Sequence, residues 1–270
     1  MSASDKVFSG SIADNYDTYL VPMIFEGYAA DLAQRVAEAK PRAILETAAG
    51  TGALTRALAV LLPAQTSYTV TDLNEPMLQR AAQRQGNDPR IIWRQVDAMS
   101  LPFDDDSFDA VCCQFGAMFF PDRVTAYRET RRVLRADGRF HFSVWDDIRH
   151  NEFARVVTET AAGLFPSDPP LFLARTPHSY HDVRQIEADV RAAGFSEIRI
   201  DTVERRSEAL TPRVVATALC QGTPLRSEIE AREAGALEKV TDLVTQAITR
   251  IYGDGPISGK MQAHVVSARA

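Results

Sequence analysis

The stretch "AILETAAGTGALTRAL", residues 43–58, decides the fold of this chain. It begins as an apolar run, passes an acid at Glu46 and two glycines at Gly50 and Gly52, and continues as a run of helix formers. A glycine turn between a strand and a helix lets the backbone approach a ligand closely, and the N-terminus of the helix offers free N–H groups and a positive dipole end. The stretch therefore predicts a strand, a turn and a helix with a ligand site at the turn.

Strand and helix patterns alternate from this stretch onward. The predicted strands are residues 42–48, 66–73, 90–98, 108–120 and 139–147. The helices predicted between and after them are residues 52–62, 75–85 and 122–138, the last with Gly138 just past its end. Alternation at this spacing is typical of a parallel sheet that is covered by helices on both faces.

The flanking regions are mostly helical. Pro22 should end or kink a first helix near Val21, and residues 25–39 form a cleaner amphipathic helix. After residue 150 the predicted helices are 151–165, 182–195, 211–220 and 224–252, and the strands are 197–205 and 261–269. Because no repeat or linker is visible, we expect one domain over residues 1–270. It comprises a helical lid (1–40), a cofactor-binding core (41–150) and the remaining sheet with a helical substrate cap (151–270).

Composition excludes several classes of protein. The 270 residues are 45% hydrophobic and 24% charged, as in globular proteins, and the net charge of -6 argues against nucleic-acid binding. The three cysteines have neither disulfide nor metal-site spacing, so we expect no metal. No apolar run reaches about 18 residues and the N-terminus lacks a secretory pattern, which predicts a cytoplasmic protein without a membrane span.

The acid that ends the second predicted strand extends the site. Ligands of such sheets bind at the carboxyl ends of the strands. Asp72 lies 20 residues after Gly52, a spacing that suits a carboxylate accepting hydrogen bonds from ribose hydroxyls. In the alternative, the glycines make only a tight turn and Asp72 is a solvated turn residue. Together, in an alternating chain, they favour a site for a nucleoside-containing cofactor.

Four segments resemble one known family. They are "ILETAAGTG" (44–52), "VTDLNEPML" (70–78), "RQVDAMSLPFDDDSFDAVCCQFGAMFFPD" (94–122) and "VLRADGRFHFSVW" (133–145). They are similar to class I S-adenosylmethionine-dependent methyltransferases of the ubiquinone/menaquinone-methyltransferase-like group, the type 11 group. The resemblance covers residues 41–146, and its most specific element is "LPFDDDSFD" (101–109). It implies an α/β, Rossmann-like sheet of seven strands, mostly parallel with the last strand antiparallel.

The resemblance also implies which residues hold S-adenosylmethionine. Glu46 would orient the methionine amino group, Asp72 would bind the ribose and Asp97 would accept from the adenine amino group. The full set implied is Tyr16, Glu46, Thr47, Gly50, Gly52, Asp72, Leu73, Met77, Asp97, Ala98, Gln114 and Phe115. The family pattern E-x-G-x-G-x-G has Ala48 in place of its first glycine here. Alanine fits if its φ is negative and is strained otherwise.

Methyl transfer needs alignment of donor and acceptor, and a hydroxyl acceptor also needs a base. The candidate bases are His178 and His181 in "TPHSYHD" (176–182). Alternatively, this loop only forms a turn and a helix cap, with Asp182 or Ser179 as the capping residue. The acceptor pocket is expected to be apolar and lined by Tyr19, Phe119 and Trp145.

The sequence therefore predicts a methyltransferase that acts on a small, apolar or aromatic metabolite at oxygen, nitrogen or carbon. Two alternatives stay open: a nicotinamide-dependent oxidoreductase, although G-x-G-x-x-G is absent, and a cofactor-binding protein without transfer activity. The segment 224–252 predicts either a cap over the substrate pocket or a homodimer contact.

Overall fold

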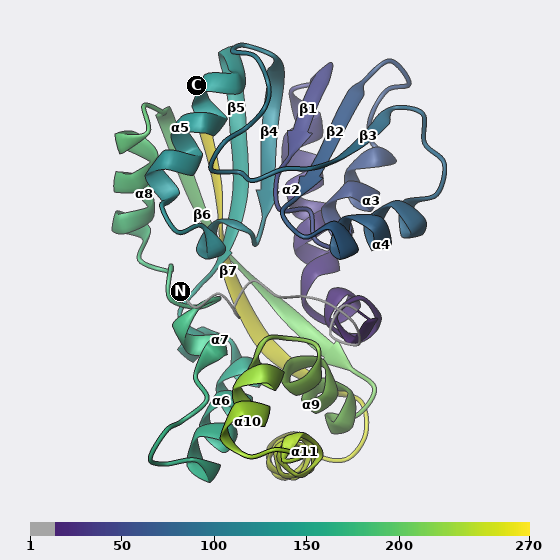
Figure 1. The fold of residues 1–270 in the computed structure, drawn as a ribbon, viewed down its shortest axis with the longest axis vertical. Helices are drawn as coiled ribbons and strands as arrows, with labels where there is room; N and C mark the ends of the chain where they lie inside the picture. Colours follow the sequence, from purple (N-terminus) through teal and green to yellow (C-terminus); the bar gives the residue numbers. More distant parts are fainter. Residues whose placement is uncertain (1–13) are drawn as a thin grey trace. The chain divides into compact units, whose positions relative to one another are not determined.

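The computed structural model describes residues 14–270, and these divide into two compact units (Figure 1). The sheet unit comprises residues 26–145, 180–203 and 263–270, and the helical unit comprises residues 14–25, 146–179 and 204–262. The chain crosses between the units five times, so neither unit is one continuous segment. Most of the segment that was expected to be a helical substrate cap lies in the helical unit.

Seven strands form one sheet in the order β3-β2-β1-β4-β5-β7-β6. Their bounds are β1 Ala43–Glu46, β2 Ser67–Asp72, β3 Ile91–Gln95, β4 Phe108–Gln114, β5 Leu134–Trp145, β6 Ser196–Ala209 and β7 Ile257–Arg269. The first five strands pair in parallel, and β7 is antiparallel to β5. The prediction of a Rossmann-like, mostly parallel sheet with an antiparallel last strand is thereby confirmed.

Three helices cover one face of the sheet: α2 (Glu26–Glu38), α3 (Ala53–Ala59) and α4 (Glu75–Gln85) (Figure 1). Their apolar stripes form one buried cluster with residues of the central strands, including Leu32 of α2, Leu58 of α3, Ile44 of β1, Tyr68 of β2 and Cys112 of β4. Alternate strand residues face the same side of a sheet, so this cluster fixes the register of β1 and β2.

The opposite face carries α5 (Arg123–Val133) and α8 (Val183–Ala192) (Figure 1). Phe140 and Phe142 of β5 stack with ring centroids 4.8 Å apart, and Tyr127 of α5 packs on both. Phe195, which follows α8, contacts Phe140. The intervening His141 bonds instead to Ser267 of β7. Burial lowers the pKa of His141 to about 4, consistent with a packing role.

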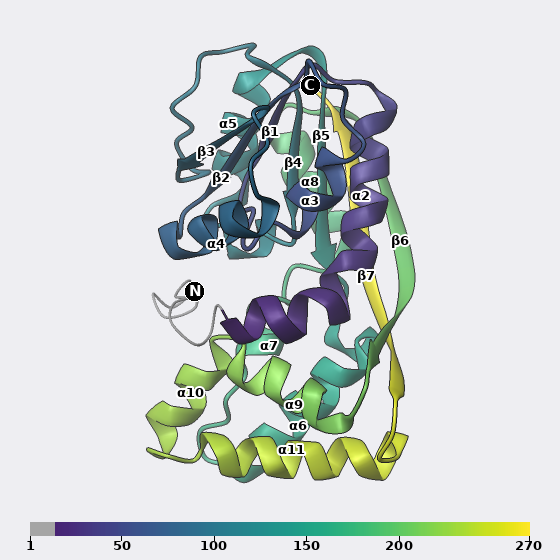
Figure 2. The same cartoon turned by 90° about the vertical axis from the view of Figure 1, so that its right-hand side faces the viewer.

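The helical unit is built around α11 (Leu237–Tyr252), which packs along α6 (Glu152–Leu164) and α9 (Pro212–Gln221) (Figure 2). The smaller elements are η2 (Tyr16–Phe25), η4 (Ile148–His150), α7 (Phe172–Arg175) and α10 (Leu225–Arg232), while η3 (Ala117–Phe119) belongs to the sheet unit. Val240, Val244 and Ile248 form the buried stripe of α11 at helical spacing. Between residues 14 and 270, no helix has the length and apolar character needed to cross a bilayer.

Two predicted helix boundaries are wrong, and the prediction for Pro22 holds only in part. Pro22 does not end the first helix, but the backbone around it departs from a regular α-helix: η2 is a π-helix that contains Pro22 and continues directly into α2. The helix over residues 122–138 ends at Val133, because Leu134 pairs with Phe108 in the sheet and Gly138 lies within β5.

The long helix predicted over residues 224–252 is two helices, α10 and α11. The chain turns between them at Gly235, whose φ is 81°. That left-handed conformation cannot continue an α-helix. Asp182 caps α8, as in the turn-and-cap alternative: its side chain accepts a hydrogen bond from the N–H of Arg184, and Gly194 follows the helix at φ 95°.

Candidate functional site

The glycine loop, residues 47–52, connects β1 to α3 through left-handed backbone conformations. Gly50 and Gly52 have φ angles of 57° and 80°. A Cβ at Gly52 would lie 3.0 Å from the Cβ of Ala81 on α4, so glycine is required there for space as well as for conformation. The loop therefore lies close against α4 before α3 begins.

Ala48 is the one non-glycine residue of this loop with a positive φ, at 53°. The condition for an unstrained alanine is therefore not met, since the left-handed region costs an ordinary residue about 1–2 kcal/mol. Its methyl group lies against Gly116, which follows β4. A Cβ added at Gly116 would be 2.4 Å from the Cβ of Ala48 and 2.8 Å from the sulfur of Cys113. Ala48 carries a methyl group where the family pattern has glycine. This methyl group fits because Gly116, on the neighbouring loop, has no side chain.

Asp72 ends β2 and holds two loops together. One carboxylate oxygen accepts a hydrogen bond from the N–H of Gly50 at 2.8 Å, and the other accepts from the N–H of Asn74 at 2.7 Å. Burial raises the pKa of Asp72, and these hydrogen bonds oppose the rise. The side-chain amide of Asn74 also donates to this carboxylate at 3.4 Å. A carboxylate has about four lone-pair positions, so acceptor capacity remains for one ligand hydroxyl.

Glu46 ends β1 and is buried, with 1% of its surface exposed. One of its carboxylate oxygens accepts hydrogen bonds from the hydroxyl of Thr55 at 2.7 Å and from the hydroxyl of Tyr68. Burial raises the pKa of Glu46 to about 7, although both hydrogen bonds lower it. A cation at this carboxyl would favour its ionised form.

Three aromatic rings, the aromatic trio of Tyr28, Phe115 and Trp145, lie at the ends of β4 and β5. Phe115 and Trp145 stack with centroids 4.0 Å apart and an interplanar angle of 11°. The ring of Tyr28 meets them edge-on at 5.4 and 5.5 Å. Phe115 has a φ of 51°, and its N–H donates to the carbonyl of Ser143 at 3.0 Å. Apolar rings are therefore gathered beyond the end of β4, the strand that pairs with β1 beside the glycine loop.

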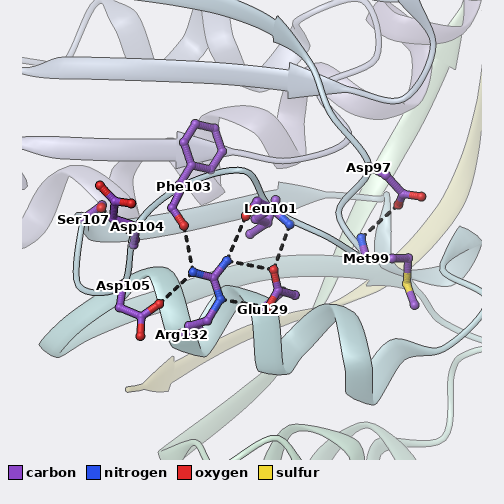
Figure 3. A network of polar contacts seen from close by, with 9 residues as sticks. All are labelled: Asp97, Met99, Leu101, Phe103, Asp104, Asp105, Ser107, Glu129 and Arg132. Atoms are coloured by element: carbon purple, nitrogen blue, oxygen red, sulfur yellow. Dashed lines mark hydrogen bonds and ion pairs between the residues drawn. The ribbon is translucent and has the colours of Figure 1, made fainter.

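The acidic loop, residues 97–107, follows β3. Asp97 forms a tight turn, because its carboxylate accepts from the N–H of Met99 at 2.9 Å and its carbonyl accepts from the N–H of Ser100 at 3.0 Å. Arg132 and Glu129 of α5 hold the next residues of the loop (Figure 3). Met77 is buried in the first turn of α4, and Leu73 is 43% exposed.

The predicted cofactor residues fall in the sheet unit, with one exception. Those at or just beyond the carboxyl ends of β1–β4 are Glu46, Thr47, Gly50, Gly52, Asp72, Leu73, Met77, Asp97, Ala98, Gln114 and Phe115. Tyr16 lies on η2 in the helical unit, where its ring packs on Phe25 at 5.3 Å. Of the predicted pocket residues, Phe119 and Trp145 belong to the sheet unit and Tyr19 to the helical unit. The roles of all these residues stay predictions.

The two candidate bases lie in different units. His178 belongs to the helical unit, and its Nδ1 is 2.8 Å from the carbonyl oxygen of Asp146. Because a carbonyl can only accept, Nδ1 carries the hydrogen and Nε2 holds the lone pair when the ring is neutral. His181 belongs to the sheet unit and directly precedes the capping residue Asp182. The geometry thus assigns the Nδ1–H tautomer to the neutral ring of His178.

Several contacts of the site were missed from the sequence. The missed residues are Thr55, Tyr68, Asn74, Glu129 and Arg132. The two-residue period of strands was a usable signal for one of them, because it places Tyr68 on the same face as Asp72. Over the described part of the chain, no group of three or more His, Cys, Asp and Glu side chains could hold a metal ion.

Comparison with known proteins identifies the core of the chain. Residues 45–142 match the family described as "Methyltransferase domain". The demethylmenaquinone methyltransferase of Clavibacter sepedonicus is 30% identical over 164 residues, which are 57% of this chain and 66% of that protein. The ubiquinone/menaquinone biosynthesis C-methyltransferase UbiE of Hahella chejuensis is 37% identical over 99 residues, 36% of this chain and 40% of that protein. The chain thus spans no more than 66% of either relative's length.

A solved structure supports the same fold. The YcgJ protein of Bacillus subtilis has a TM-score of 0.57 to this chain, covering 90% of this chain and 98% of its own, with 21% sequence identity. The family match confirms the resemblance identified from the sequence over residues 45–142, and the solved structure supports the fold alone.

Proposed function

We propose that this chain, a class I S-adenosylmethionine-dependent methyltransferase of the ubiquinone/menaquinone-methyltransferase-like group, transfers a methyl group to a small, apolar or aromatic acceptor. One observation carries the proposal. The segment that matches the methyltransferase family, residues 45–142, also contains the acids Glu46, Asp72 and Asp97 at the ends of adjacent parallel strands. The cofactor supplies a methyl group that is already activated on a sulfonium.

The acids fit the groups that such a cofactor presents. Asp72 is held by two backbone N–H groups and the side-chain amide of Asn74, and it keeps acceptor capacity toward the ribose. Glu46 has a carboxyl that a neighbouring ammonium would ionise, so it pairs with the methionine amino group in this proposal. Asp97 accepts from the adenine amino group, and the backbone of Ala98 donates to the ring.

The aromatic trio supports the assignment of the methyl-bearing end. A cation is attracted to the face of an aromatic ring within about 6 Å, with an energy of about 0.5–2 kcal/mol. In the proposed arrangement Gln114 and Phe115 lie beside the methionine portion, and Phe119 and Trp145 contribute to an apolar acceptor pocket. Because the donor is activated, alignment and the exclusion of water are the main contributions of these residues.

We further propose an electron-rich aromatic ring as the acceptor, methylated at carbon. The names of the two relatives, which refer to menaquinone and ubiquinone and, in one case, to a C-methyltransferase, support this class. After a ring carbon is methylated, a proton must leave it, and we propose that it goes to Nε2 of His178, whose Nδ1–H is held by the carbonyl of Asp146. Replacement by glutamine, His178→Gln, should lower kcat and leave the affinity for S-adenosylhomocysteine unchanged.

The test combines binding and transfer. Calorimetric titration with S-adenosylhomocysteine is expected to show micromolar or tighter binding. Methyl transfer from labelled S-adenosylmethionine is then measured on a panel of hydroquinones, phenols, small amines, peptides and nucleic acids, where we expect label only in aromatic acceptors. Transfer confined to peptides, nucleic acids or polar amines would contradict the acceptor class.

Two outcomes would favour the alternatives. Binding of a nicotinamide dinucleotide but not of S-adenosylhomocysteine would favour an oxidoreductase. Binding of S-adenosylhomocysteine without transfer to any acceptor would favour a cofactor-binding protein that lacks transfer activity. Sedimentation of the same preparation tests the predicted homodimer contact.

A further inference from the structure

Arg132, in the last turn of α5, donates all five of its N–H groups (Figure 3). Two go to the carboxylate of Glu129, one turn earlier on the helix, at 2.8 and 2.9 Å. The other three go to the acidic loop: to the carbonyls of Leu101 and Phe103 at 2.8 and 2.7 Å, and to the carboxylate of Asp105 at 2.8 Å. One side chain therefore binds the loop at every second residue from Leu101 to Asp105.

Glu129 completes this attachment. Its carboxylate accepts a hydrogen bond from the N–H of Leu101 at 2.8 Å, so both backbone polar groups of Leu101 are held by the pair. The hydrogen bonds from Arg132 lower the pKa of Glu129, which keeps it ionised near neutral pH. Leu101 itself is buried, with 4% of its surface exposed. The loop is thus anchored to α5 at one well-defined residue.

This anchor lies directly after the turn that is proposed to receive the adenine. Asp97 bonds to the N–H groups of Met99 and Ser100, and Leu101 is the next residue. A turn of this length has little freedom once both of its ends are held: β3 fixes it before Asp97, and Arg132 fixes it at Leu101. The orientation of Asp97 and Ala98 therefore depends on a helix residue that would not itself touch the ligand.

We propose that Arg132 is a positioning residue for the cofactor, because it sets the conformation of the Asp97–Met99 turn by attaching the acidic loop to α5. The inference rests on the proposed function, in which this turn holds the adenine. Arginine is required because its planar guanidinium offers five donors in a fixed arrangement, whereas a lysine offers three on a flexible stem.

The effect is expected to be local to the loop. The side chain of Arg132 is 31% exposed, and the carboxylates of Glu129 and Asp105 are 24% and 70% exposed. Ion pairs at such partly exposed positions contribute little to global stability. Loss of Arg132 should therefore free the loop without unfolding the sheet unit.

The experiment compares Arg132→Met with Arg131→Met, a matched control that removes the same charge one position earlier on α5. Binding of S-adenosylhomocysteine and of adenosine is measured by calorimetry. For Arg132→Met we expect the Kd of both ligands to rise by about tenfold or more, the effect of losing one strong hydrogen bond. Arg131→Met is expected to bind both as the unchanged protein does. In transfer assays, the KM for S-adenosylmethionine should rise by the same factor while kcat at saturation stays within about twofold.

The outcomes separate this inference from the proposed function. If the unchanged protein fails to bind S-adenosylhomocysteine, the proposed function fails and this inference fails with it. If the unchanged protein binds and folded Arg132→Met binds equally well, or loses kcat with no change in KM, only the positioning role is overturned. Should Arg132→Met fail to fold, Arg132→Lys keeps the charge and carries the test: weaker binding of both ligands supports the role, and unchanged binding overturns it.

Discussion

The glycine loop follows β1 and the acidic loop follows β3, the two strands that flank β2 in the sheet, yet the two loops are held in different ways. The glycine loop, residues 47–52, depends on three left-handed residues and on the buried carboxylate of Asp72. The acidic loop, residues 97–107, depends on the many-donor side chain of Arg132 at the surface of α5.

The difference shows two physical routes to a defined irregular segment. In the glycine loop, backbone conformation and close packing leave few alternative conformations. A single added methyl or a single lost carboxylate should therefore have a large effect on stability or ligand binding. In the acidic loop, the side chains are partly exposed and Asp106 alone has a positive φ, so order comes mainly from several hydrogen bonds to one guanidinium. The first should be sensitive to shape, and the second to the loss of donors.

Removal of the carboxylate that holds the glycine loop should have the largest effect. We expect Asp72→Ala to weaken binding of S-adenosylhomocysteine by about 1.5–3 kcal/mol, the range for hydrogen bonds to a charged group. Calorimetric titration measures this change. Asp72→Asn is the control: it keeps one acceptor oxygen for the N–H of Asn74 and should lose less. Unchanged affinity in a folded Asp72→Ala protein would contradict the placement of the ribose.

The next effect tests whether the glycine loop is limited by space. Gly116→Ala would place a methyl 2.4 Å from the Cβ of Ala48, so we expect the free energy of unfolding to fall by about 1–3 kcal/mol. In the double variant with Ala48→Gly, that contact disappears while the one 2.8 Å from the sulfur of Cys113 remains, so part of the stability should return. Denaturant unfolding of the two single variants and the double variant measures the coupling. Additive losses would show that the two positions do not share this space.

Ala48→Gly alone makes the matching control for strain. Relief of the left-handed conformation is worth about 1–2 kcal/mol, while the added freedom of glycine in the unfolded chain costs about 0.5–1 kcal/mol. The net change should therefore be a small gain in stability, visible in the same unfolding curves.

The smallest effect concerns pH and the carboxyl that precedes the glycine loop. The pKa of Glu46 is raised from 4.5 to about 7 in the folded chain. The folded state therefore binds the extra proton, and the stability contributed by this group is fully present below pH 4.5 and is lost as the pH rises through about 7. Relative to Glu46→Gln, the melting temperature of the apo protein should fall by a few °C across this window.

Ligand binding gives the opposite sign and provides a second check. If Glu46 pairs with the methionine amino group, affinity for S-adenosylhomocysteine should rise as the pH passes through about 7, because the carboxyl must ionise to attract the ammonium. Glu46→Gln should show no such rise. An equal pH dependence in both proteins would place the titrating group elsewhere.

Much of the sheet unit could be predicted from the sequence because its signals are local. The apolar run that becomes β4, and the proline in the first turn of α4, belong to elements whose neighbours in sequence decide them. The end of α5 could not be predicted in this way. Arg135–Gly138 resembles a helix end, but pairing of Leu134 with the distant Phe108 begins the strand earlier.

The residues of the site also differ in whether local sequence signals could predict them. Asp72 was predictable because its spacing from the glycines is short and fixed by one strand and one helix. Arg132 was not, because α5 also carries Arg128 and Arg131, and only contacts with a loop 27–31 residues earlier distinguish it from them. Likewise, the space for the methyl group of Ala48 depends on Gly116, which lies beside it in the fold but far away in the sequence.

The five crossings of the chain between the two units have a consequence for protein engineering. Since each unit is assembled from separate segments, no single pair of cuts in the gene isolates either one. A fragment such as residues 26–145 would lack β7, and β5 would then expose an unpaired edge with the backbone groups that now bond to that strand. Chimaeras that exchange the helical unit between relatives therefore need matched junctions at all five crossings, and a library built from one contiguous exchange should yield mostly aggregated chains.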